Sequence, residues 1–156
     1  MKKILVSECL YGGRPVRYDG GEKAETNPIF LQWKEEGRLI PVCPEVFGGL
    51  PIPRPEAQRI GDRVINIEGA DVTDSYMRGA REALRLAKEW DVALCLMKQG
   101  SPACGSRMIH DGTFSGRKIP GQGVATQLLR QEGFAVFGED QIDEAAVYLQ
   151  QLEMNK

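Results

Sequence analysis

Three short apolar runs, residues 4–6, 39–42 and 93–97, each give way to a loop rich in glycine and proline. Short apolar runs of this kind are typical of strands in a parallel sheet, which is covered by helices on both faces. A cysteine follows each run at a short distance; these edge cysteines are Cys9, Cys43 and Cys104. If the runs are neighbouring parallel strands, the three thiols meet at the carboxyl edge of one sheet, where open α/β sheets bind ligands.

Helical segments separate the apolar runs. Asn27 followed by Pro28 predicts the start of a helix, and Gly37 predicts its end. Periodicity predicts three further helices, over residues 74–89, 120–132 and 142–152. It also predicts a fourth strand over residues 134–137. This alternation predicts an α/β fold: a single domain over residues 1–156, built as a Rossmann-like three-layer sandwich with a mostly parallel sheet of about four strands.

Turn residues and helical spacing predict three further details of the fold. Gly61-Asp62 joins two short runs within residues 47–69, which predicts a hairpin outside the sheet, and Asp111-Gly112 indicates another tight turn. The i, i+3, i+7 spacing in the helix over residues 74–89 predicts one buried face. Its members would be Met77, Ala80, Leu84 and Ala87.

Composition limits the class of protein. The 156 residues are 42% hydrophobic and 27% charged, which is ordinary for a globular domain with a sizeable core. No signal-like segment is present, and no apolar run approaches the ~20 residues of a membrane span. We therefore expect a cytoplasmic protein without membrane attachment. The net charge of −2 gives no overall attraction for nucleic acid and favours a small substrate.

The four cysteines are expected to differ in role. Cys95 stands in the middle of an apolar run and is predicted to be a small buried side chain. The edge cysteines lie among turn residues, which favours a metal site in a reducing compartment. A structural zinc site usually includes a local Cys-x-x-Cys pair, and the sequence has none. His110 would complete a Cys₃His site, but it precedes a predicted turn and is expected at the surface.

Three widely spaced thiolates are compatible with a cubane 4Fe-4S cluster, which usually takes four cysteine ligands. With three, one iron keeps an open coordination position. An open iron is a Lewis acid that can bind a substrate sulfur or oxygen without exchanging electrons. The pattern thus favours chemistry over electron transfer.

Six ordered motifs resemble the thiouracil desulfidase family, domain of unknown function family 523, from about residue 4 to residue 140. They are Ser7-Glu8-Cys9-Leu10-Tyr11-Gly12, Arg17-Tyr18-Asp19-Gly20, Cys43-Pro44-Glu45 with Gly48-Gly49-Leu50, Pro53-Arg54-Pro55-Glu56, Ser101-Pro102-Ala103-Cys104-Gly105 and Asp111-Gly112-Thr113-Phe114-Ser115-Gly116. The resemblance implies a 4Fe-4S cluster held by the three edge cysteines. It also implies that Glu45 and Ser101 take part in catalysis.

The sequence departs from the family pattern in two places. Ala103 stands where many relatives have serine, and nothing matches the additional C-terminal domain of some relatives. The first difference is mild because Ser101 is retained. The second disfavours a large substrate such as tRNA.

The implied reaction is hydrolytic desulfidation of a thiolated pyrimidine, which turns thiouracil and water into uracil and hydrogen sulfide. Glu45, two residues beyond Cys43, is placed to take a proton from attacking water and to return it later. Ser101, three residues before Cys104, is placed to hydrogen-bond the substrate or relay a proton. The partners would be a small thiolated pyrimidine and water.

Other residues border the same predicted edge. Charged loop residues that could orient a pyrimidine or a phosphate are Arg14, Arg17, Asp19 and Arg54. Aromatic residues that could stack on a flat base are Tyr18, Phe47 and Phe114. Gly121-x-Gly123 before a helix is a weak anion-binding signal because it lacks the full dinucleotide fingerprint.

Two alternative functions remain open from the sequence. A desulfidase acting on thiolated nucleosides or tRNA would need a basic groove beside the cluster. A non-catalytic iron–sulfur or zinc sensor would share the ligands without turnover. Release of sulfide from thiouracil separates the enzyme from the sensor.

Overall fold

A four-stranded, fully parallel sheet forms the centre of the molecule. The computed structural model describes residues 1–13, 15–21 and 24–154. The strand order is β2-β1-β5-β8, and the strands are β1 (Ile4–Ser7), β2 (Leu39–Val42), β5 (Leu94–Met97) and β8 (Val136–Gly138). Val6 of β1 pairs with Pro41 on one side and Leu96 on the other. The four predicted strands are therefore present, the fourth of them shifted by one to two residues.

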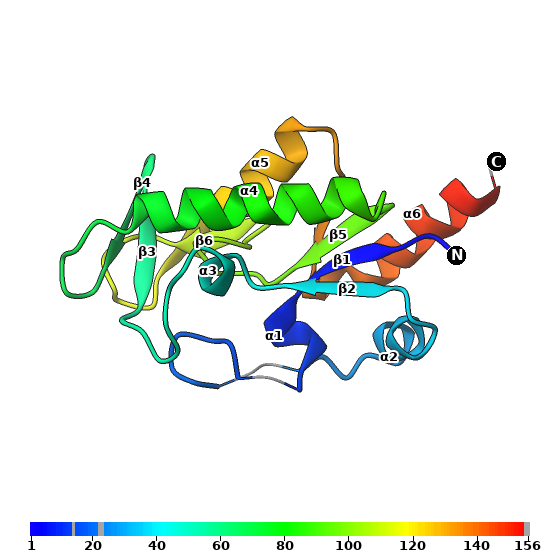
Figure 1. Cartoon of the computed structure of the whole chain (residues 1–156), viewed down its shortest axis with the longest axis horizontal. Helices are drawn as coiled ribbons and strands as arrows, with labels where there is room; N and C mark the ends of the chain where they lie inside the picture. Colours follow the sequence, from blue (N-terminus) through cyan, green and yellow to red (C-terminus); the bar gives the residue numbers. More distant parts are fainter. Residues whose placement is uncertain (14, 22–23, 155–156) are drawn as a thin grey trace.

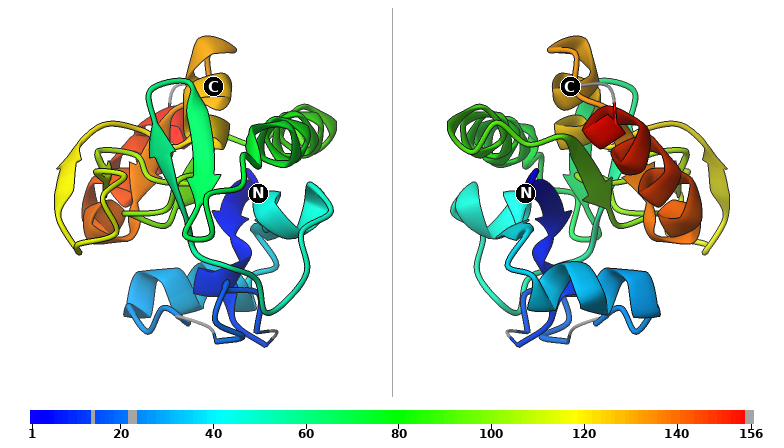
Figure 2. Two further views of the ribbon diagram at one scale, coloured as in Figure 1. Left: turned by 90° about the vertical axis from the view of Figure 1, so that its left-hand side faces the viewer. Right: turned by 90° about the vertical axis from the view of Figure 1, so that its right-hand side faces the viewer.

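Helices cover both faces of this sheet, which confirms the three-layer sandwich (Figures 1 and 2). Successive side chains of a strand point to opposite faces. Leu5 and Cys95 pack with α4 (Thr73–Glu89) and α5 (Val124–Gln131). Ile4 and Leu94 pack with α2 (Pro28–Glu35) and α6 (Ile142–Met154) on the other face. Because both faces of these strands are covered by helices, side chains on either face are mostly apolar. This explains the continuous apolar runs in the sequence.

Local sequence signals set several helix ends. Asn27 caps α2, since its side-chain oxygen accepts a hydrogen bond from the Ile29 amide at 2.8 Å, and Pro28 is the first helical residue. Gly37, with φ of +73°, ends the turn that follows. The helix predicted from residue 120 begins later, at Val124, because Lys118–Pro120 forms β7 instead.

The predicted buried face of α4 is partly wrong. Met77 is 37% exposed and Leu84 is only partly buried. Gly79 faces inward because α4 approaches α3 (Pro44–Phe47) so closely that a Cβ on Gly79 would lie 1.7 Å from the Pro44 carbonyl oxygen. The buried face consists mainly of small residues: Thr73, Tyr76, Gly79, Ala80, Ala83 and Ala87.

Two antiparallel ribbons lie beyond the carboxyl ends of the strands, at the end of the molecule opposite both termini (Figure 1). The first is the predicted hairpin, β3 (Ala57–Ile60) with β4 (Arg63–Asn66). The second pairs β6 (Met108–His110) with β7 (Lys118–Pro120). The predicted turn at Asp111-Gly112 opens the loop between β6 and β7, with the Asp111 carboxylate accepting the Thr113 amide at 2.9 Å. These ribbons lie along the carboxyl edge of the sheet and border the space next to it.

Candidate active site at the carboxyl edge of the sheet

A cavity of about 330 Å³ opens at the carboxyl ends of β1, β2 and β5. All three edge cysteines line it, together with the predicted catalytic residues Glu45 and Ser101. Because β1 lies between β2 and β5, the loops that follow these three strands are neighbours in space. The structure thus brings together five site residues from three distant segments of the chain.

Each edge cysteine is placed by the turn that ends its strand. Cys9 lies in the short helix α1 (Glu8–Tyr11) that follows β1 directly. Cys43 is the residue before α3, and Pro44 starts that helix. Cys104 lies in the loop after β5, where its amide donates to the Ser101 hydroxyl oxygen at 3.0 Å. The thiols therefore sit on backbone fixed by hydrogen bonds or helix starts.

The protein environment keeps these thiols neutral in the absence of a metal. Burial, together with the charge of Cys43, raises the pKa of Cys9 to about 12. Burial also raises the pKa of Cys43, with the Glu45 carboxylate acting in the same direction. The Cys104 pKa is raised well above its ordinary value by burial, although a hydrogen bond from Ser7 opposes this rise. Three mutually repelling thiolates in a buried site need a compensating positive centre.

The three thiols are a donor set chemically compatible with an iron–sulfur cluster. Within residues 1–13, 15–21 and 24–154, no three or more His, Cys, Asp or Glu side chains meet around one metal position. In a cubane each cysteine binds a different iron, so its ligand sulfurs stand farther apart than those around one tetrahedral ion. Three soft thiols spaced around one cavity fit such a cluster.

The Glu45 carboxylate is held in a fixed orientation. Its Oε2 accepts hydrogen bonds from Arg54 Nε at 3.1 Å and from the Tyr76 hydroxyl at 2.7 Å. Arg54 is itself fixed, because its other nitrogens donate to the carbonyl oxygens of Pro51 and Val16. Both bonds to the carboxylate use Oε2, so within the described residues Oε1 is the oxygen available to a ligand. Burial raises the pKa of Tyr76 well above its ordinary value, and the Glu45 charge adds to that rise.

The Ser101 hydroxyl oxygen has a structural task. It accepts the backbone amides of Ala103 at 3.1 Å and of Cys104 at 3.0 Å. A hydroxyl offers two acceptor sites and one donor. With both acceptor sites engaged, the proton is the group that Ser101 can offer to a ligand.

The predicted substrate-binding residues fall into different places. Arg17 and Arg54 line the cavity, and the Arg54 guanidinium is already engaged with Glu45. Asp19 is outside the cavity lining, and its carboxylate accepts the Gly21 amide at 2.9 Å. Arg14 lies outside the described residues. Among the three aromatic candidates, Tyr18 lines the cavity, whereas Phe47 and Phe114 do not.

The prediction that His110 is a surface residue was wrong. His110 is half-buried, it lines the cavity, and its Nδ1 is buried without a hydrogen-bond partner in the described residues. The reason is that β6 folds back over the loop after β5, where the Gly100 amide donates to the Met108 carbonyl oxygen at 3.0 Å. Lys118, opposite His110 in β7, lines the same wall.

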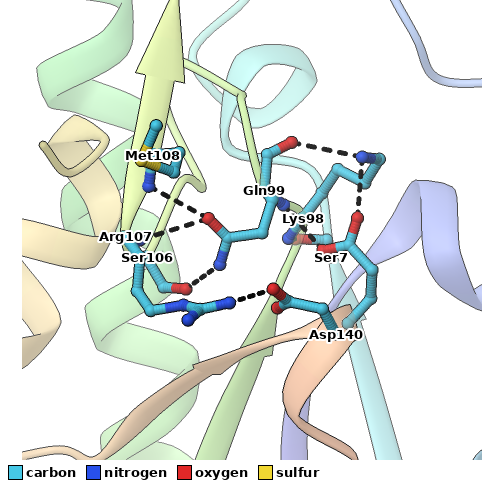
Figure 3. Close-up of polar contacts among 8 residues, drawn as sticks. Ser7, Lys98, Gln99, Ser106, Arg107, Met108 and Asp140 are labelled. Carbon is cyan, nitrogen blue, oxygen red and sulfur yellow. Dashed lines mark hydrogen bonds and ion pairs between the residues drawn. The ribbon is translucent and has the colours of Figure 1, made fainter. Parts of the chain in front are cut away.

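Sequence reasoning also missed the polar residues directly after β5. The Gln99 amide oxygen accepts the backbone amides of Arg107 at 3.2 Å and Met108 at 3.1 Å, and its amide nitrogen contacts the Ser106 hydroxyl (Figure 3). Gln99 therefore fixes the loop that leads into β6. The available signal was the abrupt change from the apolar run to Lys98-Gln99 at the strand end.

Fold and site together define a three-layer α/β protein with a thiol-lined cavity at the carboxyl edge of its sheet. Comparison with known proteins identifies its family. The chain matches the 2-thiouracil desulfurase family over residues 4–141, and it belongs to that family. None of the helices in the described residues has the length and apolar character needed to cross a bilayer.

Two individual proteins illustrate the relationship. The chain is 38% identical to the uncharacterized protein YbbK of Bacillus subtilis over 151 residues, which cover 90% of this chain and 98% of that protein. It is 46% identical to the solved structure of the [4Fe-4S]-dependent thiouracil desulfidase TudS. That match has a TM-score of 0.94 and covers 97% of this chain and 99% of the other.

Proposed function

We propose that this protein is an iron–sulfur-dependent desulfidase that hydrolyses thiolated pyrimidines, converting thiouracil and water into uracil and hydrogen sulfide. The observation that carries this proposal is the shared cavity of the three edge cysteines, Glu45 and Ser101. The similarity to TudS, at 46% identity over nearly the whole of both chains, supports the same chemistry.

The edge cysteines would hold the cluster. When bound, a 4Fe-4S cluster with three cysteine ligands supplies an open iron, a Lewis acid with affinity for the soft sulfur of a thiocarbonyl group. Cys95 takes no part, because it is fully buried in β5.

Glu45 would act as the general base and later as the acid. Water attacks the carbon of the C=S group, and the Oε1 atom of Glu45 takes one of its protons. Arg54 and Tyr76 bind Oε2, so they hold the carboxylate in place while Oε1 takes the proton. The carboxylate returns the proton to sulfur as the C–S bond breaks, the second water proton passes to solvent, and the water oxygen remains on carbon as the new carbonyl oxygen.

Ser101 would orient the ring. Its hydroxyl proton is available to an acceptor atom of the pyrimidine, while its oxygen holds the amide of Cys104. One side chain thereby links the position of the substrate to the position of a cluster ligand.

Anaerobic reconstitution followed by turnover of 2-thiouracil tests the proposal. We expect about four irons and four acid-labile sulfides per chain, and equal amounts of uracil and sulfide without any electron donor. A loaded protein that releases no sulfide would be a sensor, and a requirement for a reductant in every turnover would contradict hydrolysis.

A further inference from the structure

Lys98 is a cavity residue to which the proposed reaction gives no task. It follows the last residue of β5 and lines the cavity together with Cys9. Its ammonium lies 2.7 Å from Glu139 Oε2 and donates to the Gln99 carbonyl oxygen at 3.1 Å. The side chain is only 25% exposed, so Lys98 is a held cation at the edge of the sheet.

Hydrogen bonds also hold the backbone around Lys98. The Lys98 amide donates to the Ser7 hydroxyl oxygen at 2.9 Å, which ties the end of β5 to the end of β1. Glu139 uses both carboxylate oxygens, since Oε1 accepts the Gln99 amide at 2.7 Å while Oε2 binds the ammonium. Glu139 follows β8. Residues at the ends of β1, β5 and β8 therefore fix the position of Lys98 together.

The cationic member of this ion pair is the one that lines the cavity. Lys98 lines the cavity, whereas Glu139 is not among the described residues that line it. An ammonium carries three N–H donors, and the two contacts made within the described part of the chain leave one for a ligand.

Desulfidation creates an anion in this cavity. A lone pair of water forms the new C–O bond, and the C–S bond breaks with both electrons going to sulfur. One water proton leaves with sulfur as hydrosulfide and the other passes to solvent. A fixed cation near the departing atom stabilises charge that is absent from the neutral substrate.

We propose that Lys98 is a further catalytic residue, whose ammonium donates a hydrogen bond to the sulfur as it leaves the pyrimidine as hydrosulfide. This inference rests on the proposed function. It assigns Glu139 as the positioning residue that holds the ammonium at the cavity wall.

Iron-loaded protein carrying Lys98→Met tests the assignment, because methionine keeps the length of the side chain without the charge. Losing one donor to a developing anion typically lowers kcat by about 10²-fold. We expect this loss with full iron content and little change in KM for 2-thiouracil. Sodium hydrosulfide should inhibit the variant about ten- to a hundredfold more weakly, the loss expected for one hydrogen bond to an ion, whereas inhibition by uracil should not change. Lys98→Arg should recover part of the loss.

Lys88→Met is the matched control. Lys88 also forms a lysine–glutamate pair, with Glu132 at 3.0 Å, but it is exposed and remote from the cavity. Unchanged kcat and hydrosulfide inhibition in Lys98→Met would overturn the inference. It would also be overturned if the variant lost iron and its inhibition by uracil and hydrosulfide weakened equally, because that pattern indicates a purely structural lysine. If the wild-type protein turns over no thiouracil, the proposed function fails, while hydrosulfide titration of the loaded protein still tests Lys98.

Discussion

Cys95 and Cys104 lie only nine positions apart, yet the structure gives them different surroundings. Cys95 is inside β5, and burial alone raises its pKa to about 12. Cys104 is in the loop after the same strand, where burial is joined by a hydrogen bond from Ser7 and by the charges of Cys9 and Cys43. Among the described residues, a thiol inside the sheet thus has no polar or charged neighbour that shifts its pKa, whereas thiols that follow different strands lie close together at the edge of the sheet.

The comparison teaches that position relative to a strand end decides what a cysteine can do. Within the sheet, every neighbour is apolar because both faces are covered by helices. At the edge, loops supply polar partners, and buried polar residues such as Ser7, Arg54 and Ser106 lie there. A metal centre needs partners of this second kind.

The largest expected effect comes from the edge cysteines. Changing any one of them to alanine should remove most of the bound iron and all desulfidation, because a cubane with two ligands is poorly held. Iron content and sulfide release are measured on the same anaerobic samples. Normal iron content in Cys9→Ala would contradict the ligand assignment.

Glu45→Gln should have the next largest effect. Glutamine keeps the shape of the side chain but cannot act as a base, and such a group typically contributes about 10²–10⁴-fold to the rate. We expect kcat to fall in this range while iron content stays normal. Turnover like that of the wild type would remove Glu45 from the mechanism.

Ser101→Ala should reduce kcat by about tenfold, the equivalent of one hydrogen bond. Because Ser101 also holds the amide of Cys104, this change should make the cluster more labile to a chelator. Ser101→Thr keeps the hydroxyl and serves as the control. Equal rates of iron loss in the two variants would show that the contact to Cys104 does not matter.

Tyr76→Phe should have a smaller effect on the rate. It removes one of two hydrogen bonds to Glu45 Oε2 and leaves the bond from Arg54 in place. We expect a decrease in kcat of a few-fold and a loss of about 1 kcal/mol in the free energy of unfolding. Chemical denaturation and steady-state kinetics check the two values, and a loss of iron would contradict this limited role.

Cys95→Ala should be the mildest cysteine change. It removes one buried atom without disturbing a polar contact, at a cost of about 1 kcal/mol in the free energy of unfolding. Iron content and kcat should match the wild type. Loss of the cluster in Cys95→Ala would contradict the assignment of a packing role to Cys95 and of ligand roles to the edge cysteines alone.

The sequence predicted the sheet and the edge cysteines because both depend on local patterns. Apolar runs define strands, and the residues that follow parallel strands share one edge wherever those strands are neighbours. The Asn27-Pro28 start and the Gly61 hairpin depend on backbone preferences that single residues carry.

Features that depend on tertiary contact could not be predicted in this way. The inward turn of Gly79 follows from the close approach of α3, and the position of His110 follows from the pairing of β6 with the loop after β5. Neither contact leaves a periodic signal in the sequence. Lys98 was overlooked because its partner, Glu139, lies 41 positions away and follows another strand.

Turnover of 2-thiouracil in ¹⁸O-labelled water tests the central claim most directly. If the edge of the sheet hosts hydrolysis, the uracil formed by iron-loaded protein carries one ¹⁸O atom, and one sulfide appears for each uracil. Uracil without the label, or sulfide release only when an electron donor is added, would contradict the account.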